Sequence, residues 1–143
     1  MGTDFRPARS EDAGGLVALV EALGYPDLPG RVQARLERLI ARDDHAVFVA
    51  ARGGELVGWI HVQEFHSLAS DPIALIAGLS VDPACRRSGL GRGLVARAEH
   101  WARGRGLSSL RLRARVTRTG AHAFYRRLGF ELAKEQLQFR KEL

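Results

Sequence analysis

The sequence has almost no cysteine and no long apolar run. Cys85 is the only cysteine in 143 residues, so the chain cannot close an internal disulfide. No stretch resembles a secretory leader or reaches the roughly 18 consecutive apolar residues of a membrane-spanning helix. Both absences favour a reducing, cytoplasmic setting. A chain of this length buries roughly two thirds of the surface that its unfolded form exposes, so it needs no metal or disulfide to fold as one domain.

Clusters of metal ligands are also missing. His45, His100 and His122 do not group with one another or with Cys85 at the spacings typical of zinc sites. The sequence therefore predicts no metal centre, and Cys85 is interpreted as a loop thiol without a catalytic task.

Lysine is scarce and asparagine is absent, whereas arginine is abundant and unevenly distributed. The net charge is +6, but residues 1–85 carry 7 Arg against 12 Asp and Glu, and residues 86–127 carry 12 Arg against one Glu. The simplest electrostatic interpretation is a cationic ligand for the first half and an anionic ligand for the second. The alternative is that the arginines reflect codon usage and solvated faces.

The segment Arg86-Arg87-Ser88-Gly89-Leu90-Gly91 joins an apolar run, residues 73–81, to an amphipathic stretch, residues 90–105. The first turn of a helix has N–H groups without intrahelical partners at the positive end of the helix dipole, where a phosphate can bind. Glycines allow close approach to the backbone, and arginines add permanent charge. A GxGxxG fingerprint would need glycine at Leu94, and no P-loop pattern occurs.

Two motifs together resemble the GNAT superfamily of N-acetyltransferases. Residues 86–91 fit the [Gln/Arg]-x-x-Gly-x-[Gly/Ala] loop, and residues 121–130, AHAFYRRLGF, fit the segment that follows about thirty residues later in that family. Residues 5–8 and 11–12 resemble the family's first strand and first helix. The resemblance thus implies one N-acetyltransferase domain over residues 3–143.

Periodicity gives the same order of elements as that family. We expect a single-domain α/β fold with a mixed, mostly antiparallel sheet of six to seven strands and about four helices. Strands are predicted at residues 3–7, 46–51, 56–65, 73–81, 110–116, 130–133 and 137–141. Helices are predicted at residues 10–23, 32–42, 89–105 and 120–128, with a turn at residues 25–30.

The resemblance implies acetyl-CoA as the cosubstrate. The backbone of the 73–81 strand would pair with the pantetheine arm, and the loop and first helical turn would bind the pyrophosphate. The implied cofactor residues are Leu79, Ser80, Val81, Arg86, Arg87, Ser88, Gly89, Leu90, Gly91, Arg92, Gly93, Phe124 and Tyr125. Arg118 stands where the family often has asparagine, and it either binds a cofactor phosphate or is only a loop charge.

Tyr125 matches the tyrosine that many family members use as the general acid. A phenol with a pKa near 10 keeps its proton at neutral pH and can protonate a departing thiolate. The alternative is a core position, because residues 121, 124, 125 and 128 form a helical stripe.

The general base is harder to assign, because the family's frequent glutamate has no counterpart in residues 75–79. Candidate bases are Glu64, His61 and His66, or water. Each of these side chains could instead be a solvated or structural polar group.

The leading hypothesis is acetylation of a small cationic amine, aminoglycoside-like or a polyamine, with a peptide or protein amine as the alternative. Two further classes are an acyl-CoA-binding regulator without catalysis and a basic nucleic-acid-binding module, the latter weakened by the lack of a stacking motif on a strand. The Arg111, Arg113 and Arg115 face could contact solvent, cofactor phosphates, the acceptor or another subunit. A homodimer is common among relatives, and no membrane partner is expected.

Overall fold

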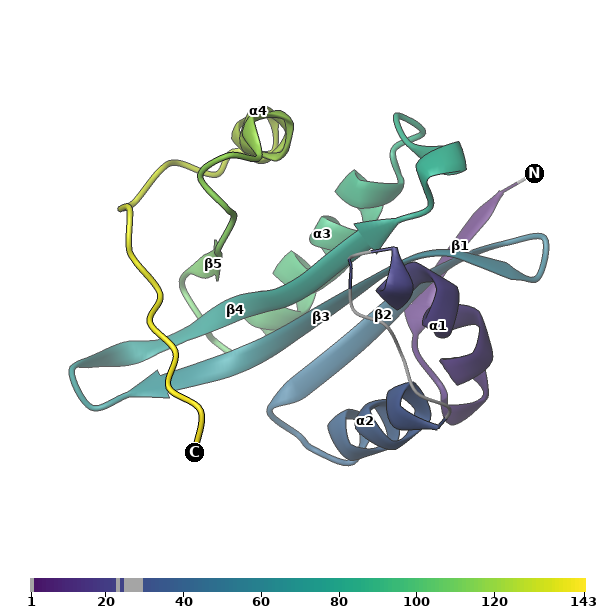
Figure 1. Ribbon diagram of the computed structural model, residues 1–143, viewed down its shortest axis with the longest axis horizontal. Helices are drawn as coiled ribbons and strands as arrows, with labels where there is room; N and C mark the ends of the chain where they lie inside the picture. The colour runs from purple at the N-terminus through teal and green to yellow at the C-terminus, as the bar shows by residue number, and fades with distance from the viewer. Residues whose placement is uncertain (1, 23, 25–29) are drawn as a thin grey trace. The chain divides into compact units, whose positions relative to one another are not determined.

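A computed structural model describes residues 2–22, 24 and 30–143. They divide into two compact units, one ending at Leu112 and the other running from Arg113 to Leu143, and each is described by itself (Figure 1). The turn expected at residues 25–30 lies outside the described residues except for Gly30, as does residue 23 at the expected end of the first helix.

The first unit is built on a five-stranded sheet in the order β1-β2-β3-β4-β5 (Figure 1). The first four strands pair antiparallel, and β5 pairs parallel to β4. The β-rich run of β2, its hairpin partner β3 and the nearly continuous apolar run of β4 produce this sheet, as expected. The strands are β1 (Thr3–Pro7), β2 (His45–Arg52), β3 (Glu55–Ser67), β4 (Ser70–Val81) and β5 (Leu110–Leu112).

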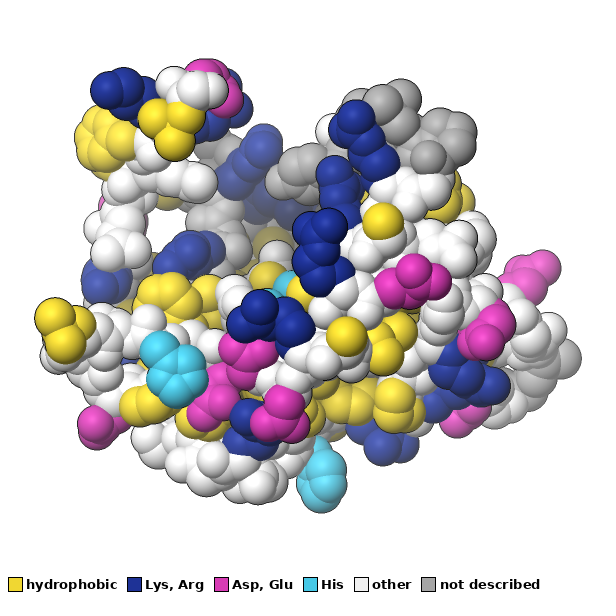
Figure 2. Space-filling view, turned by 90° about the horizontal axis from the view of Figure 1, so that it is seen from below, with side chains coloured by type: hydrophobic (Ala, Val, Ile, Leu, Met, Phe, Trp, Pro, Cys, Tyr) yellow, Lys and Arg dark blue, Asp and Glu magenta, His cyan; other side chains and the backbone are white. Residues whose placement is uncertain are grey.

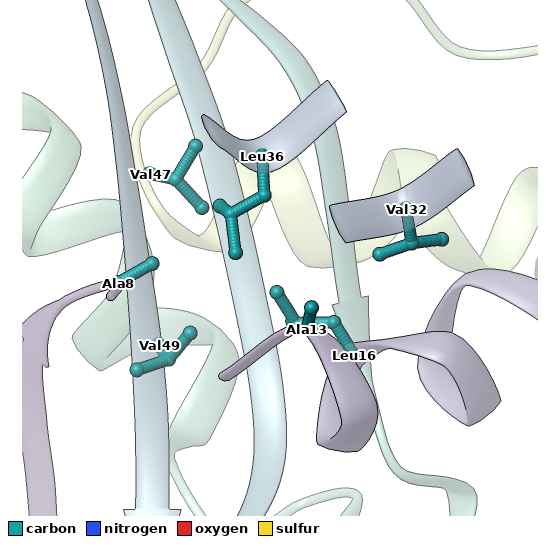
Figure 3. Close-up of a cluster of buried hydrophobic side chains, with 7 residues drawn as sticks. All are labelled: Ala8, Ala13, Leu16, Val32, Leu36, Val47 and Val49. Atoms are coloured by element: carbon teal, nitrogen blue, oxygen red, sulfur yellow. The ribbon is translucent and has the colours of Figure 1, made fainter. Parts of the chain in front are cut away.

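Helices cover both faces of this sheet. A short 3-10 turn, η1 (Ser10–Asp12), leads into α1 (Ala13–Glu21), which packs with α2 (Arg31–Ile40) on one face. Their apolar side chains meet those of β2 in a buried cluster (Figure 3): Ala8, Ala13, Leu16, Val32, Leu36, Val47 and Val49. A second 3-10 turn, η2 (Pro83–Cys85), precedes α3 (Leu90–Gly104), which covers the other face through Leu90, Leu94 and Val95.

The β3–β4 pairing contains an irregularity that shapes the sheet. His61 pairs with Gly78 and Val62 with Ile76, so Ala77 is an extra residue on β4. Such a bulge bends and twists its strand. On the other side of β4, β5 pairs only with residues 74–76. Within the described part of the first unit, β4 therefore has no strand partner on this side after Ile76.

The second unit contains α4 (Thr119–Arg127) and an extended C-terminal segment. The helix agrees with the expected one, and Gly129, two residues after its end, has a φ of +93° that suits glycine. No strand occurs in residues 113–143, all of which are described. The expected strands at 130–133 and 137–141, and the extension of β5 to residue 116, are therefore corrected, and the sheet has five strands rather than six to seven. The alternating pattern of these segments meets no neighbouring strand, and Phe139 is 87% exposed.

Candidate functional site

The loop before α3 has the backbone geometry of an anion-binding turn. The Asp82 carboxylate accepts a hydrogen bond from the Ala84 N–H at 3.0 Å, and the Ser88 hydroxyl donates to the Cys85 carbonyl. Arg87 and Gly89 have φ values of +65° and +82°, which reverse the chain into the helix. A left-handed backbone conformation is energetically costly for arginine. Its presence at Arg87 indicates that the shape of this turn serves the function of the loop.

The first turn of α3 leaves amides free for a ligand. The first intrahelical bond runs from the Gly93 N–H to the Gly89 carbonyl at 3.0 Å, so the amides of residues 89–92 have no intrahelical acceptor. A Cβ at Gly89 would meet nothing within 4 Å, which shows open space beside the turn. Leu90 and Leu94, at most 2% exposed, fix the helix on the sheet. Arg86, Arg87 and Ser88 are exposed around these amides.

Gly93 has a different environment from the loop glycines. A Cβ at this position would lie 2.2 Å from Cζ of the Phe5 ring. Gly93 therefore permits α3 to approach β1 closely, one helical turn after the loop. Its packing explains the glycine without any contact with a ligand.

The second half of β4 presents unpaired backbone groups next to this loop. The Asp82 N–H donates to the Val57 carbonyl of β3 at 2.8 Å. Because N–H directions alternate along a strand, the N–H groups of Leu79 and Val81 point toward the free side of β4, and that of Ser80 points toward β3. The Ser80 side chain is buried, with its hydroxyl 3.5 Å from the Leu19 carbonyl of α1.

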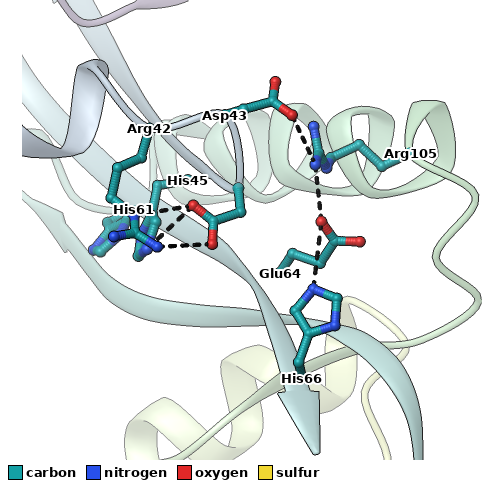
Figure 4. A network of polar contacts seen from close by, with 8 residues as sticks. Arg42, Asp43, His45, His61, Glu64, His66 and Arg105 are labelled. Carbon is teal, nitrogen blue, oxygen red and sulfur yellow. Dashed lines mark hydrogen bonds and ion pairs between the residues drawn. The ribbon is translucent and has the colours of Figure 1, made fainter.

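His61 lies opposite Gly78, beside the bulge, and forms a close pair with His45. His45 Nδ1 and His61 Nε2 are 2.8 Å apart, and the rings stack with centroids 5.1 Å apart (Figure 4). Burial, together with the charge of His45, lowers the pKa of His61 from 6.5 to about 4. His61 is therefore neutral at pH 7, and one of its two ring nitrogens carries a lone pair.

Glu64 lies farther from the free part of β4 and is already paired. Its carboxylate contacts the Arg105 guanidinium at 2.8 Å and His66 at 3.8 Å (Figure 4). Glu64 pairs with Ala74, five residues before Leu79, a distance of roughly 16 Å along the strand. Arg105 also contacts Asp43 at 3.4 Å. Glu64 therefore belongs to a structural network of ion pairs, and its carboxylate is already bound by Arg105.

Several acidic side chains of the first half lie next to arginines on the surface. Figure 2 shows both kinds side by side on the lower part of the face in view. Asp12 receives a bidentate contact from Arg6 at 2.7 and 2.9 Å, and Arg42 pairs with Asp44 at 3.0 Å. The hydrogen bonds from Arg6 lower the pKa of Asp12. At Asp12 and Asp44 the negative charge of the first half is therefore neutralised locally.

Tyr125 belongs to the second unit, where it is half-buried on α4. Its ring contacts Phe124 and Phe130 edge-on, with centroids 5.4 and 5.9 Å apart. Burial raises the pKa of Tyr125 above 10, against a smaller opposite effect of the Arg118 charge. The phenol is therefore protonated at neutral pH, as a general acid must be.

Sequence reasoning missed Trp59, whose indole lies over Gly78 and whose Nε1 is buried without a hydrogen-bond partner among the described residues. No local pattern marks it, because its position depends on the β3–β4 register. No group of three or more His, Cys, Asp or Glu side chains in the described ranges could hold a metal ion. None of the helices described combines the length and apolarity that crossing a bilayer requires.

Comparison with known families decides the assignment. Residues 16–130 match the acetyltransferase (GNAT) family. The chain belongs to this family. It is an acetyl-CoA-dependent N-acetyltransferase, as the two sequence motifs imply.

Individual relatives agree with the family assignment. An aminoglycoside N(6')-acetyltransferase type 1 of Stenotrophomonas maltophilia is 34% identical over 124 residues, covering 83% of this chain and 80% of the relative. A mycothiol acetyltransferase of Thermobispora bispora is 33% identical over 145 residues, covering 96% of this chain but only 48% of that protein. The GNAT fold is shared with the solved structure of AAC(6')-Iy in complex with the bisubstrate analogue CoA-S-monomethyl-acetylneamine, at a TM-score of 0.89, 20% identity and full coverage of both chains.

Proposed function

We propose that this enzyme acetylates a primary amine of a small, cationic, aminoglycoside-like molecule. The observation that carries the proposal is the 34% identity to an aminoglycoside N(6')-acetyltransferase over most of both chains. A polyamine is a second cationic acceptor of the same class. The mycothiol acetyltransferase relative supports a mycothiol-related acceptor as an alternative, but the chain spans about half of that protein.

The residues of the first unit fit acetyl-CoA. The free amides of residues 89–92, with Arg86 and Arg87 around them, would hold the pyrophosphate, and the free edge at Leu79 and Val81 would hold the pantetheine arm. A helix N-terminus without acidic side chains in its first turn is suited to a phosphate. When bound, acetyl-CoA supplies the activated acetyl group and a thiolate leaving group.

Tyr125 is proposed to deliver the proton that the thiolate needs. Its raised pKa keeps the phenol protonated at neutral pH. Phe124 and Phe130 hold the ring by edge-on contacts, which limit its rotation. In the proposed site, the role of Phe124 is thus to orient the acid rather than to react.

His61 is a better candidate for the base than Glu64. The imidazole is neutral at pH 7 and lies opposite Gly78, one residue from the free edge of β4. The Glu64 carboxylate is bound by Arg105 and lies beyond the bulge. With a pKa of about 4, His61 is a weak base that would not keep the proton, so we propose that it orients a water through which the proton of the acceptor ammonium passes to bulk solvent.

The test is release of free thiol from acetyl-CoA by the purified protein with a panel of amines. The panel contains neamine, spermidine and a lysine-containing peptide. We expect the fastest release with neamine. Faster release with the peptide would contradict the small-molecule assignment, and acetyl-CoA binding without thiol release from any amine would indicate a non-catalytic acyl-CoA-binding protein.

A further inference from the structure

The Trp59 side chain of β3 fills space that β4 leaves open at Gly78. In the sheet it lies between Val49 of β2 and Ser80 of β4. Its ring leans over Gly78, where a Cβ would sit 2.5 Å from Cη2 and 2.8 Å from Cζ3 of the indole. A side chain at position 78 would collide with this ring, so Gly78 and Trp59 form one packing unit, the Trp59–Gly78 contact.

This contact lies beside the part of β4 that is free for the cosubstrate. Gly78 directly follows the bulged residue Ala77 and directly precedes Leu79, whose N–H points to the unpaired side. The Ser80 hydroxyl, on the same face as Trp59, points to the Leu19 carbonyl of α1. Trp59 therefore lies on the α1 side of the sheet, partly buried against the core cluster of Figure 3 and next to the backbone proposed to hold the pantetheine arm.

The indole has an unmet hydrogen-bonding requirement. Trp59 Nε1 is buried and has no acceptor among the described residues. Buried indole N–H groups usually find a partner, because leaving a donor unpaired is costly. The other tryptophan, Trp101, has a clear structural partner, since the Arg105 guanidinium lies 5.1 Å from its ring centroid.

We propose that Trp59 recognises the acceptor: its ring packs against the C–H face of a cyclic, hydroxylated amine, and its Nε1–H donates to a hydroxyl or ether oxygen of that molecule. This inference rests on the proposed function and narrows it. An aminosugar offers both an apolar ring face and oxygen acceptors. A linear polyamine offers neither, so Trp59 discriminates between the two classes of cationic amine.

Tryptophan fluorescence tests the proposal directly, because the chain contains two tryptophans. In the Trp101→Phe variant, all tryptophan emission comes from Trp59 in its native surroundings. We expect neamine to shift or quench this emission with saturation at the concentration range of its KM, and spermidine to leave it unchanged. The Trp59→Phe variant, which keeps only Trp101, is the matched control and should show no response to neamine.

Steady-state kinetics separate the two parts of the proposal. Trp59→Phe keeps a ring but removes the donor and should raise the KM for neamine about 2- to 10-fold, the range of one hydrogen bond. Trp59→Leu and Gly78→Ala remove or displace the ring and should raise this KM by more than about 10-fold. All three variants should leave the KM values for acetyl-CoA and for spermidine unchanged. If Trp59 and Gly78 had a purely structural role, replacing them would change these values as well.

Two results overturn the inference. If the Trp101→Phe enzyme acetylates neamine at full rate while its emission stays constant through saturation, Trp59 does not contact the acceptor, and the acetyltransferase proposal stands. If no amine in the panel causes thiol release, both the proposed function and this inference fail. Because the fluorescence titration uses the native Trp59, it remains decisive even where a Trp59 variant does not fold.

Discussion

Replacing Gly93 by alanine is the sharpest test of how the loop is positioned. Gly93 lies in α3, one turn after the proposed pyrophosphate site, against the Phe5 ring of β1. A Cβ at this position would lie 2.2, 2.5 and 2.9 Å from three atoms of that ring. Ordinary van der Waals contact begins at about 3.4 Å, so either the ring or the helix must move by more than about 1 Å.

The size of the effect follows from two opposing terms. Inserting a methyl group into a packed interface costs about 1–3 kcal/mol of unfolding free energy. Replacing glycine by alanine within a helix returns about 0.5–1 kcal/mol. We therefore expect Gly93→Ala to be less stable than the natural protein by about 1–2 kcal/mol. Since α3 carries the loop, we also expect weaker binding of acetyl-CoA.

Gly104→Ala is the matched control for this substitution. Gly104 lies in the same helix, and a Cβ there would meet nothing within 4 Å. The Gly104→Ala variant gains the helix propensity of alanine without a collision. The difference in unfolding free energy between the two variants therefore measures overpacking alone. Urea unfolding should separate them by about 1–3 kcal/mol. Equal stability of the two variants would show that α3 does not press on Phe5.

Other expectations concern proton transfer, pH and the loop. Tyr125→Phe should lower kcat about 10²- to 10⁴-fold with unchanged acetyl-CoA affinity, measured by steady-state kinetics and calorimetry; an unchanged kcat would remove Tyr125 from the mechanism. Because the folded-state pKa of His61 is about 4, below its unfolded value of 6.5, the unfolded state binds more protons between these values, so stability should fall as the pH drops from about 6.5 to 4. Urea unfolding at several pH values should show this slope in the natural protein and a smaller slope in His61→Gln. Glu64→Gln should keep kcat within about twofold. It should lower the free energy of unfolding by about 1 kcal/mol, because the ion pair with Arg105 is lost. A loss of about 100-fold in kcat would instead identify Glu64 as the base. Gly89→Ala places alanine at a φ of +82° without a collision, so it should weaken acetyl-CoA binding in calorimetry through strain alone, and unaltered affinity would show that the turn tolerates a side chain.

Local patterns in the sequence predict most of the fold. The glycine and arginine loop ahead of α3 and the β-rich runs of β2 and β3 on either side of a Gly-Gly turn carry their signals within a few residues. The structure places these elements within a few residues of the predicted bounds. The strands expected at 130–133 and 137–141 show the limit of this approach. Alternation indicates which residues could share a face, but a strand also requires a partner for its backbone groups, and no sequence pattern specifies that partner.

Features of the site that depend on register could not be predicted either. The bulge at Ala77 and the Trp59–Gly78 contact follow from which residues face each other across β3 and β4. A shift of one residue would move each side chain to the opposite face of the sheet. Gly78 would then be a glycine in a strand without explanation, whereas in the observed register it is the only residue type that leaves space for the indole.

Ion pairs within the first unit weaken a purely electrostatic explanation of substrate choice. The charge asymmetry of the sequence favours a cationic acceptor for the first half, but Asp12, Asp44 and Glu64 are each paired with an arginine. Paired carboxylates contribute less attraction to a distant ammonium than free ones, because their partner charges cancel much of the field. Charge alone would therefore select poorly between an aminosugar and a polyamine. Under our proposal, selection between them comes from shape and hydrogen bonding, which the Trp59 indole would supply on the sheet face covered by α1.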